Sequence, residues 1–144
     1  MRTLRSEVHI EAPPPRVWGA LTDFRSFPSW NPFIRRADGA LVPGGRIHVT
    51  LRLGGRLVTL HPKLTVVDEP RELRWLARQR VPGLFDVDRR FLLEPVEASR
   101  CRFVQSETAS GLFAPLVMPL LRRRILAGYR EMDSALKSRV EQTG

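Results

Sequence analysis

The sequence predicts an α+β protein in which one curved antiparallel sheet is closed by a single long helix. Three observations lead to this prediction. From Gly111 to Gln142, apolar side chains recur at steps of three and four residues, the spacing of one helix face. From Ile34 to Ser110, apolar and polar residues instead alternate in short runs separated by glycine and proline turns. One more alternating run, Thr3–Ile10, lies near the start of the chain.

Length and composition predict one domain that spans residues 1–144. A chain of 144 residues with 42% hydrophobic content is large enough to bury a core of its own. No run reaches the ~18 uninterrupted apolar residues of a membrane span, and charges interrupt the first residues, so we predict no transmembrane segment and no signal peptide. We therefore expect a cytoplasmic protein.

The basic excess has two interpretations. Twenty-four Lys and Arg residues against 15 Asp and Glu give a net charge of +9, which points to nucleic acid or an anionic membrane surface as a partner. The basic residues are spread along the chain, however, and the densest run, Arg122–Arg124, is only three residues long. Because aromatic residues are few and no recognised nucleic-acid motif interleaves them with the arginines, we interpret the basic residues as solvated surface and predict no specific nucleic-acid partner.

The first quarter of the chain predicts a strand followed by two short helices. Thr3–Ile10 alternates as a half-buried strand does. Ala12–Pro15 ends this strand, because proline cannot donate to a ladder, and it leads into a short helical face at Val17–Leu21. Phe24–Phe33 is aromatic and broken twice by proline, which indicates a second short helix and a loop.

The middle of the chain predicts about six antiparallel strands in a meander. Gly54–Gly55 is a hairpin turn between Ile47–Leu53 and Arg56–Val67, and Pro62 marks an edge or a bulge in the second strand. Turn sequences then precede three alternating runs, each with one apolar face. Those three faces are Leu73, Trp75 and Ala77; Phe85, Val87, Arg89, Phe91 and Leu93; and Cys101, Phe103, Gln105 and Glu107.

The final helix has an apolar stripe and a polar side. The stripe is Val117, Leu121, Ile125, Gly128, Met132, Leu136 and Val140, and the polar side includes Arg123, Arg130, Glu131, Ser134, Lys137, Ser138 and Glu141, with Arg124 and Asp133 at its margins. Pro119 predicts a bend, because a proline inside a helix removes a hydrogen bond. Gly128 lies on the stripe either because helix and sheet pack closely there or because a ligand needs the room.

Four short stretches, in this order and spacing, resemble the START-like superfamily, also called SRPBCC or polyketide cyclase/dehydrase-like. They are Ile10–Pro14 with Val17 and Trp18, Ser29–Ile34, Glu69–Trp75 and Ser106–Leu112, so the resemblance covers essentially the whole chain. It implies the helix-grip fold, a curved antiparallel sheet of about six to seven strands wrapped around a long C-terminal helix, with two short helices after the first strand. It also implies a deep apolar pocket for hydrophobic molecules such as lipids or polyketides. Some relatives cyclise or dehydrate polyketides, whereas others only carry a ligand.

Ten residues are our candidates for lining such a ligand pocket. They are Trp30, Phe33, Trp75, Phe85, Arg89, Phe91, Phe103, Gln105, Glu107 and Tyr129. Arg89 is the most informative, because a guanidinium on an apolar face needs an anionic or hydrogen-bonding partner. We expect Glu107, on the adjacent strand, to be that partner. The pair is either an internal salt bridge or a device that orients a ligand carbonyl or enolate.

No metal or nucleotide cofactor is predicted. His9 and His48 lie opposite the apolar faces of their strands and His61 lies beside Pro62, so we expect all three to be exposed. No histidine pair has metal-ligand spacing on a helix. Cys101 is the only cysteine, which excludes a disulfide within the chain and a cysteine-based metal site, and its alternating run predicts a buried thiol.

Three hypotheses for function follow. The first is the binding of a hydrophobic or amphipathic small molecule, lipid or polyketide-like, in a cavity between the C-terminal helix and the sheet, by a monomer or homodimer. The second is a polyketide cyclase or dehydrase that uses Arg89, Glu107 and Tyr129, although the sequence assigns no catalytic residue. The third is a protein-interaction module with a vestigial cavity, in which the basic surface binds an acidic partner.

Overall fold

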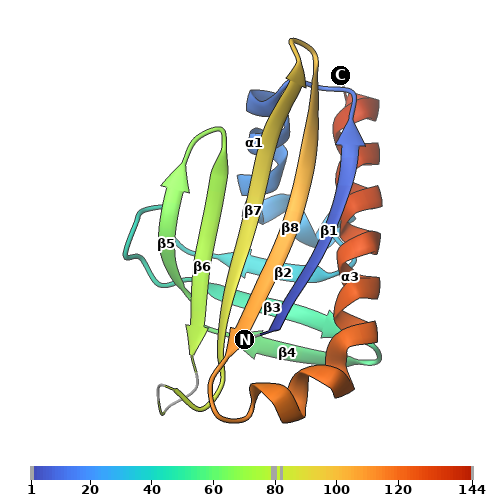
Figure 1. Ribbon diagram of the computed structural model, residues 1–144. Coiled ribbons are helices and arrows are strands. Elements are labelled where there is room, and N and C mark those ends of the chain that lie inside the picture. The colour runs from blue at the N-terminus through green and yellow to red at the C-terminus, as the bar shows by residue number, and fades with distance from the viewer. Residues whose placement is uncertain (1, 79–80, 82, 144) are drawn as a thin grey trace.

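The computed structural model describes residues 2–78, 81 and 83–143 (Figure 1). The chain opens with one strand and three short helical segments, the last two of which lie where the sequence predicted a single second helix. These are β1 (Arg2–Ile10), α1 (Pro14–Thr22), the 3-10 turn η1 (Phe24–Ser26) and α2 (Phe27–Trp30). Pro14 and Pro15 occupy the first turn of α1, where a missing N–H costs nothing because it would have no partner within the helix.

The described residues form seven further strands, which lead to one long helix. They are β2 (Ile34–Asp38), β3 (His48–Leu53), β4 (Arg56–Leu60), β5 (Lys63–Asp68), β6 (Glu72–Arg78), β7 (Asp86–Glu97), β8 (Arg100–Ser110) and the helix α3 (Ala114–Thr143). The strands make a five-stranded antiparallel sheet in the order β1-β8-β7-β6-β5 and a three-stranded one in the order β2-β3-β4. In Figure 1 the three shorter strands run across the long ones, behind them.

The strands divide between two sheets where the sequence predicted one meander of six to seven strands. The division falls at Pro62, between β4 and β5, because a proline has no N–H with which to continue the ladder. The two sheets remain connected there. Gly44 donates its N–H to the carbonyl of Leu64 at 2.7 Å, and Leu64 donates to the carbonyl of Gly45 at 2.8 Å. The resulting corner curves the β-layer around one face of the molecule.

The predicted facing of the long strands is confirmed by burial. The apolar faces assigned to β6 and β8 are buried, and on β7 the side chains of Arg89, Phe91 and Leu93 are buried too. The register places Trp75 opposite Arg89, and Arg89 opposite Glu107, so these three residues lie in one row across β6, β7 and β8. The predicted burial of Cys101 is also confirmed, and burial raises the pKa of its thiol to about 11.

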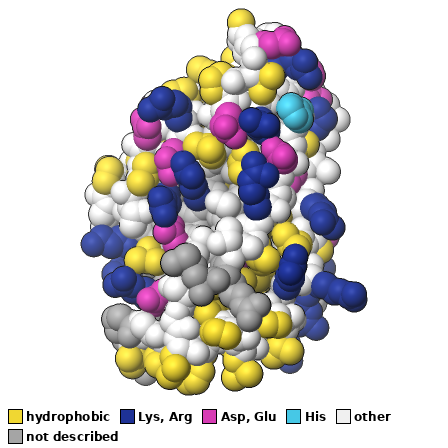
Figure 2. All heavy atoms as spheres, in the orientation of Figure 1, with side chains coloured by type: hydrophobic (Ala, Val, Ile, Leu, Met, Phe, Trp, Pro, Cys, Tyr) yellow, Lys and Arg dark blue, Asp and Glu magenta, His cyan; other side chains and the backbone are white. Residues whose placement is uncertain are grey.

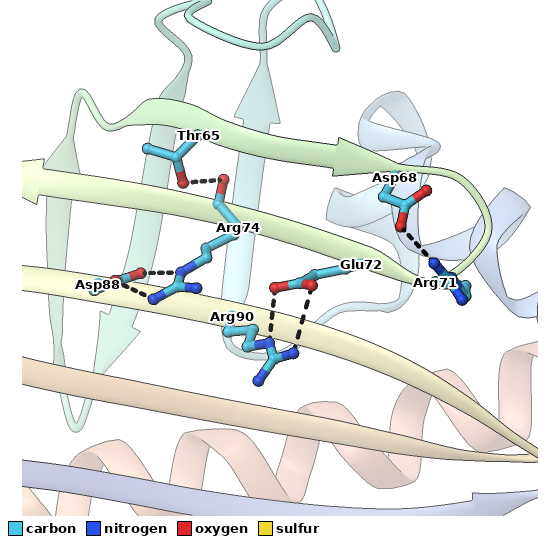
Figure 3. Close-up of polar contacts among 7 residues, drawn as sticks. All are labelled: Thr65, Asp68, Arg71, Glu72, Arg74, Asp88 and Arg90. Atoms are coloured by element: carbon cyan, nitrogen blue, oxygen red, sulfur yellow. Dashed lines mark hydrogen bonds and ion pairs between the residues drawn. The ribbon is translucent and has the colours of Figure 1, made fainter.

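The opposite face of the long sheet carries cross-strand ion pairs. Figure 2 shows basic and acidic side chains interspersed over this side of the molecule, and Figure 3 shows two of the pairs in detail. Arg74 holds Asp88 with two hydrogen bonds of 2.8 and 2.6 Å, and Arg90 donates to Glu72 at 2.7 Å. Some of the surface arginines are therefore already paired with acidic side chains.

Helix α3 lies beside β1 and also contacts β8, β3 and α1 (Figure 1). Its first turns run at an angle to the rest of the helix, as predicted from Pro119, which lies inside it. At the other end, Lys137 donates to the carbonyl of His9 and the carboxylate of Glu141 accepts the N–H of Glu11, both at 2.9 Å. No described helix combines the length and the apolar character that a membrane span requires.

Candidate ligand-binding site

A pocket of about 450 Å³ lies between the first turns of α3, the β3–β4 hairpin and the neighbouring ends of β6 and β7. Most of its lining side chains are apolar. These are Phe33, Leu51, Leu53, Val58, Leu60, Ala77, Phe85, Val87, Met118, Leu121 and Ile125. The polar lining residues are Arg56, His61, Arg78, Glu107 and Arg124.

The basic side chains of the pocket lie at its surface, and its acidic side chain lies inside. The side chains of Arg56, Arg78 and Arg124 are exposed, whereas Glu107 is buried. Arg78 lies 3.8 Å from the carboxylate of Asp86, and neither Arg56 nor Arg124 forms an ion pair with any residue in the described ranges. The pocket therefore combines a basic rim with an apolar wall and one acidic group inside it.

Arg89 lies behind this wall, with only 2% of its surface exposed. Its guanidinium carbon is 4.9 Å from the ring centre of Phe33, 4.8 Å from that of Phe91 and 4.5 Å from that of Tyr129. Such contacts stabilise a buried cation, because the faces of aromatic rings are electron-rich. Three rings on three different segments of the chain thus enclose the positive charge that the sequence placed on an apolar face.

The hydrogen bond of Arg89 goes to Gln105 rather than to the expected partner, Glu107. One guanidinium N–H donates to the side-chain oxygen of Gln105, and the nearest approach to Glu107 is a 4.0 Å ion pair between Nη1 and Oε1. The amide nitrogen of Gln105 donates in turn to Asp133 at 2.8 Å and to the backbone carbonyl of Tyr129 at 3.1 Å. Gln105 therefore connects the cation on β7 to a carboxylate on α3.

Asp133 corrects one prediction. The helical periodicity placed it at the margin of the polar side, but the structure buries it against β8. The reason is Gln105, whose amide reaches the helix and supplies the hydrogen bond that a buried carboxylate needs. The spacing of residues along α3 alone cannot show that a hydrogen-bonding partner of Asp133 lies on β8.

One buried cation thus faces two buried carboxyl groups. Burial raises the pKa of Glu107, an effect that the charge of Arg89 opposes. Burial likewise raises the pKa of Asp133, opposed by the hydrogen bond from Gln105. These carboxyl groups bind protons more readily than exposed ones do, and Glu107 presents such a group to the pocket.

Two nitrogens of the Arg89 guanidinium, Nε and Nη1, have no hydrogen-bond partner within the described part of the chain, although Nη1 is the atom that forms the 4.0 Å ion pair with Glu107. The hydroxyl of Tyr129 is buried beside the Glu107 carboxyl group, and its hydrogen bond to that group lowers the pKa of Glu107 in part. Buried donors without partners are costly and rare in folded proteins, so Nε of Arg89 is an unusual feature of this cluster.

The structure brings most of the ten predicted pocket residues together, in two layers. Phe33, Phe85 and Glu107 line the pocket. Behind them lies a layer consisting of Arg89, Gln105, Tyr129 and Phe91.

Trp75, Phe103 and Trp30 lie outside these two layers. Trp75 packs edge-on against Phe91 with ring centres 5.1 Å apart, and Phe103 stacks on Phe91 at 6.2 Å. Trp30 is half-buried and packs on Phe27, outside the pocket lining. The predicted exposure of His9, His48 and His61 is confirmed, although His61 also lines the rim of the pocket.

The predictions missed the wall that the β3–β4 hairpin contributes. Leu51, Leu53, Val58 and Leu60 form it, and their alternation was visible in the sequence. The alternation could not show that this apolar face lines a pocket, because that depends on how the three-stranded sheet crosses the five-stranded one.

The two interpretations of Gly128 are separated by its surroundings. A β-carbon built at Gly128 would lie within 3.0 Å of three ring atoms of Phe33. The glycine is therefore there because the helix packs closely against Phe33, and the ring of Phe33, not the helix backbone, faces the pocket.

A curved β-layer around one long C-terminal helix, with short helices after the first strand, defines the START-like class of helix-grip proteins. Residues 1–141 match the family described as "Polyketide cyclase / dehydrase and lipid transport". The chain therefore belongs to this family.

Solved structures agree with this fold. A START superfamily protein from Mycobacterium smegmatis has a TM-score of 0.78 and 17% identity, with 99% of each chain covered. An aromatase/cyclase from a Streptomyces species has a TM-score of 0.78 and 13% identity, covering 98% of this chain and 94% of that one. Norcoclaurine synthase from Thalictrum flavum has a TM-score of 0.73 and 14% identity over 99% and 95% of the two chains. No curated protein matches the chain in sequence.

Proposed function

We propose that the chain binds a hydrophobic or amphipathic small molecule, lipid or polyketide-like, in the pocket beneath the first turns of α3. The observation that carries this proposal is the pocket itself, whose volume of about 450 Å³ and mostly apolar lining suit a small organic ligand. The exposed Arg56 and Arg124 at the rim and the buried Glu107 inside favour a ligand that carries polar groups as well as an apolar body.

Native mass spectrometry of the purified protein, before and after organic extraction, tests the proposal. A molecule that co-purifies and is released by extraction would give the chemical class of the ligand. If nothing is released, and a panel of lipids and aromatic polyketides also fails to raise the melting temperature, the ligand-binding proposal is wrong.

A matched pair of variants on β4 sharpens this test. Val58 lines the pocket, whereas its neighbour Thr59 is exposed on the opposite face of the strand, so Val58→Trp fills the pocket and Thr59→Trp does not. We expect Val58→Trp to weaken the binding of an apolar fluorescent probe at least about tenfold, because the indole projects between the apolar walls and overlaps the space that the probe would fill. Thr59→Trp should leave probe binding unchanged.

A second candidate function is catalysis of a cyclisation or dehydration on a polyketide-like substrate. The observation that favours it is Glu107, a buried carboxyl group of raised pKa in the pocket, next to Arg89 and Tyr129. Such a group can transfer a proton to or from a bound ligand, while the arginine stabilises developing negative charge. Substituting Glu107→Gln should abolish turnover if the protein is an enzyme and change only affinity or stability if it is a carrier.

The remaining hypothesis, an interaction module with a vestigial cavity, makes a different prediction. Binding to an acidic protein would weaken steeply with salt and would be unaffected by Val58→Trp. The same pair of variants therefore separates it from the ligand-binding proposal.

A further inference from the structure

The segment Leu112–Leu121, at the start of α3, contains no charged residue. Its inner side chains, Ala114 and Met118, are buried against the fold. A helix that is apolar around its whole circumference is normally covered on every side, or lies in a membrane. Here the outer side is uncovered.

Four side chains make up that outer side, and we call them the apolar foot. Leu112 is 72% exposed, Leu116 69% and Leu120 77%, and Phe113 is exposed as well. The described residues just before β7 adjoin this surface. Leu112 and Phe113 donate their N–H groups to the carbonyls of residues 83 and 84, at 2.9 and 2.8 Å, and the nearby Val81 is also exposed.

Figure 2 shows hydrophobic side chains gathered at the lower end of the molecule, where Figure 1 places the start of α3. Scattered apolar residues are ordinary on a protein surface, but a contiguous patch of large ones marks an interaction site. The patch therefore needs a partner that can cover leucine and phenylalanine side chains.

Arginines border the apolar foot. Arg122, Arg123 and Arg124 follow it directly, are all exposed and form no ion pair with a described residue. Arg52 shares a groove with Arg123 and Arg124. This end of the molecule thus holds unpaired positive charge, unlike the long sheet, where Arg74 and Arg90 are paired across strands.

The charges decide between partners. A second copy of the chain, itself of net charge +9, would bring one set of arginines against another if the two patches met. A bilayer with anionic lipids offers both acyl chains for the leucines and phosphate groups for the arginines. Exposed leucine and phenylalanine side chains beside arginines are the residue types with which a helix lies in the membrane interface.

We propose that the apolar foot and Arg122–Arg124 dock the protein on the surface of a bilayer that contains anionic lipids. The pocket would then open toward the membrane, since Leu121 and Arg124 both line it. The docking surface shares Arg124 with the rim of the pocket, but its apolar foot, Arg122 and Arg123 lie outside the pocket lining, so the inference holds whether or not a ligand is bound there.

Co-sedimentation with vesicles tests the inference. We expect binding to phosphatidylcholine vesicles that contain ~30 mol% phosphatidylglycerol, and much weaker binding to phosphatidylcholine alone or in high salt. Leu116→Glu with Leu120→Glu should reduce the partition coefficient at least about tenfold, since carboxylates replace the inserted leucines. Arg122→Gln and Arg123→Gln should each reduce it about fivefold.

Two matched controls are present in the chain. Val96 is an exposed apolar residue near the β7–β8 turn, at the opposite end of the molecule, and Arg130 is an exposed arginine farther along α3. Val96→Glu and Arg130→Gln should bind the anionic vesicles as the unaltered protein does. Thermal melts of all the variants confirm that they are folded.

Three results would overturn the inference. One is the absence of binding to anionic vesicles by the folded protein. Another is equal loss with Arg130→Gln and Arg123→Gln, which would show diffuse charge attraction instead of a docking surface. The third is a dimer, seen by light scattering, that Leu116→Glu with Leu120→Glu converts to monomer. Apolar probe binding, measured in the same variants, reports separately on the proposed pocket function.

Discussion

Gly128→Ala tests how tightly α3 is fitted to the pocket wall. The added methyl group would lie within 3.0 Å of three atoms of the Phe33 ring, closer than non-bonded carbons approach. The ring cannot easily move away, because it packs edge-on against Tyr129 with centres 5.6 Å apart and lies under the guanidinium of Arg89 at 4.9 Å. The substitution should therefore push Phe33 toward the pocket.

Two opposing terms set the size of the effect. Forcing a methyl group into a packed site costs about 1–3 kcal/mol. Replacing glycine by alanine in a helix returns up to about 1 kcal/mol. We expect the packing term to prevail, with a net loss of about 1–2 kcal/mol in the free energy of unfolding, measured by urea denaturation.

Gly19→Ala is the matched control. Gly19 lies in α1, and a β-carbon added there would meet no atom within 4 Å, so only the helix term remains. That variant should be more stable than the unaltered protein by about 0.5–1 kcal/mol.

A double-mutant cycle isolates the contact with Phe33. Phe33→Val removes two of the three ring atoms that crowd Gly128, so Gly128→Ala should cost clearly less in that background. Equal costs of Gly128→Ala in the two backgrounds, or a gain in stability with Phe33 intact, would refute the reasoning.

Three further predictions concern the buried polar groups. Burial raises the pKa of Glu107 above its ordinary 4.5, so the contribution of Glu107 to stability is fully present below that pH and is lost as pH rises through the folded-state pKa. Between pH 4 and 8, the unfolding free energy of Glu107→Gln should therefore fall less steeply than that of the unaltered protein. Arg89→Met leaves Glu107 and Gln105 without their cation and should cost about 3–5 kcal/mol in urea denaturation, part of which Glu107→Gln should restore. The paired surface residue Arg74, altered in the same way, should cost no more than about 1 kcal/mol. The thiol of Cys101, buried and with its pKa raised to about 11, should react with a thiol reagent only at the rate at which the protein opens, and fast labelling under native conditions would contradict its burial.

The sequence could predict which side chains of each strand face the core, because alternate side chains of a strand point to opposite faces and only two assignments are possible. Leu73, Phe91 and Phe103 each lie in a run whose apolar members share one phase, so a single choice per strand placed Arg89 and Glu107 inside. Their adjacency across β7 and β8 also followed, because the strands are neighbours joined by a short turn. Periodicity therefore predicted the buried cluster well.

The pocket wall and the partner of Arg89 could not be predicted in this way. Whether Val58 faces a pocket depends on the corner between the two sheets. A hydrogen bond between Gly44 and Leu64 holds that corner, and residues so far apart in the sequence leave no local pattern that predicts their contact. The choice of Gln105 over Glu107 depends on side-chain reach, since both residues share one face of β8. Asp133 was misplaced for the same reason, because its partner comes from another element.

Phe33 connects the parts of the site that the sequence treated as separate. Its ring lines the pocket, lies under the guanidinium of Arg89 and fills the space left by Gly128. A ligand that displaces this ring would therefore also change the surroundings of Arg89, and through its charge the proton affinity of Glu107. Pocket occupancy and the protonation of Glu107 are linked by one side chain, so proton uptake or release on ligand binding should diminish when Phe33 is replaced by valine.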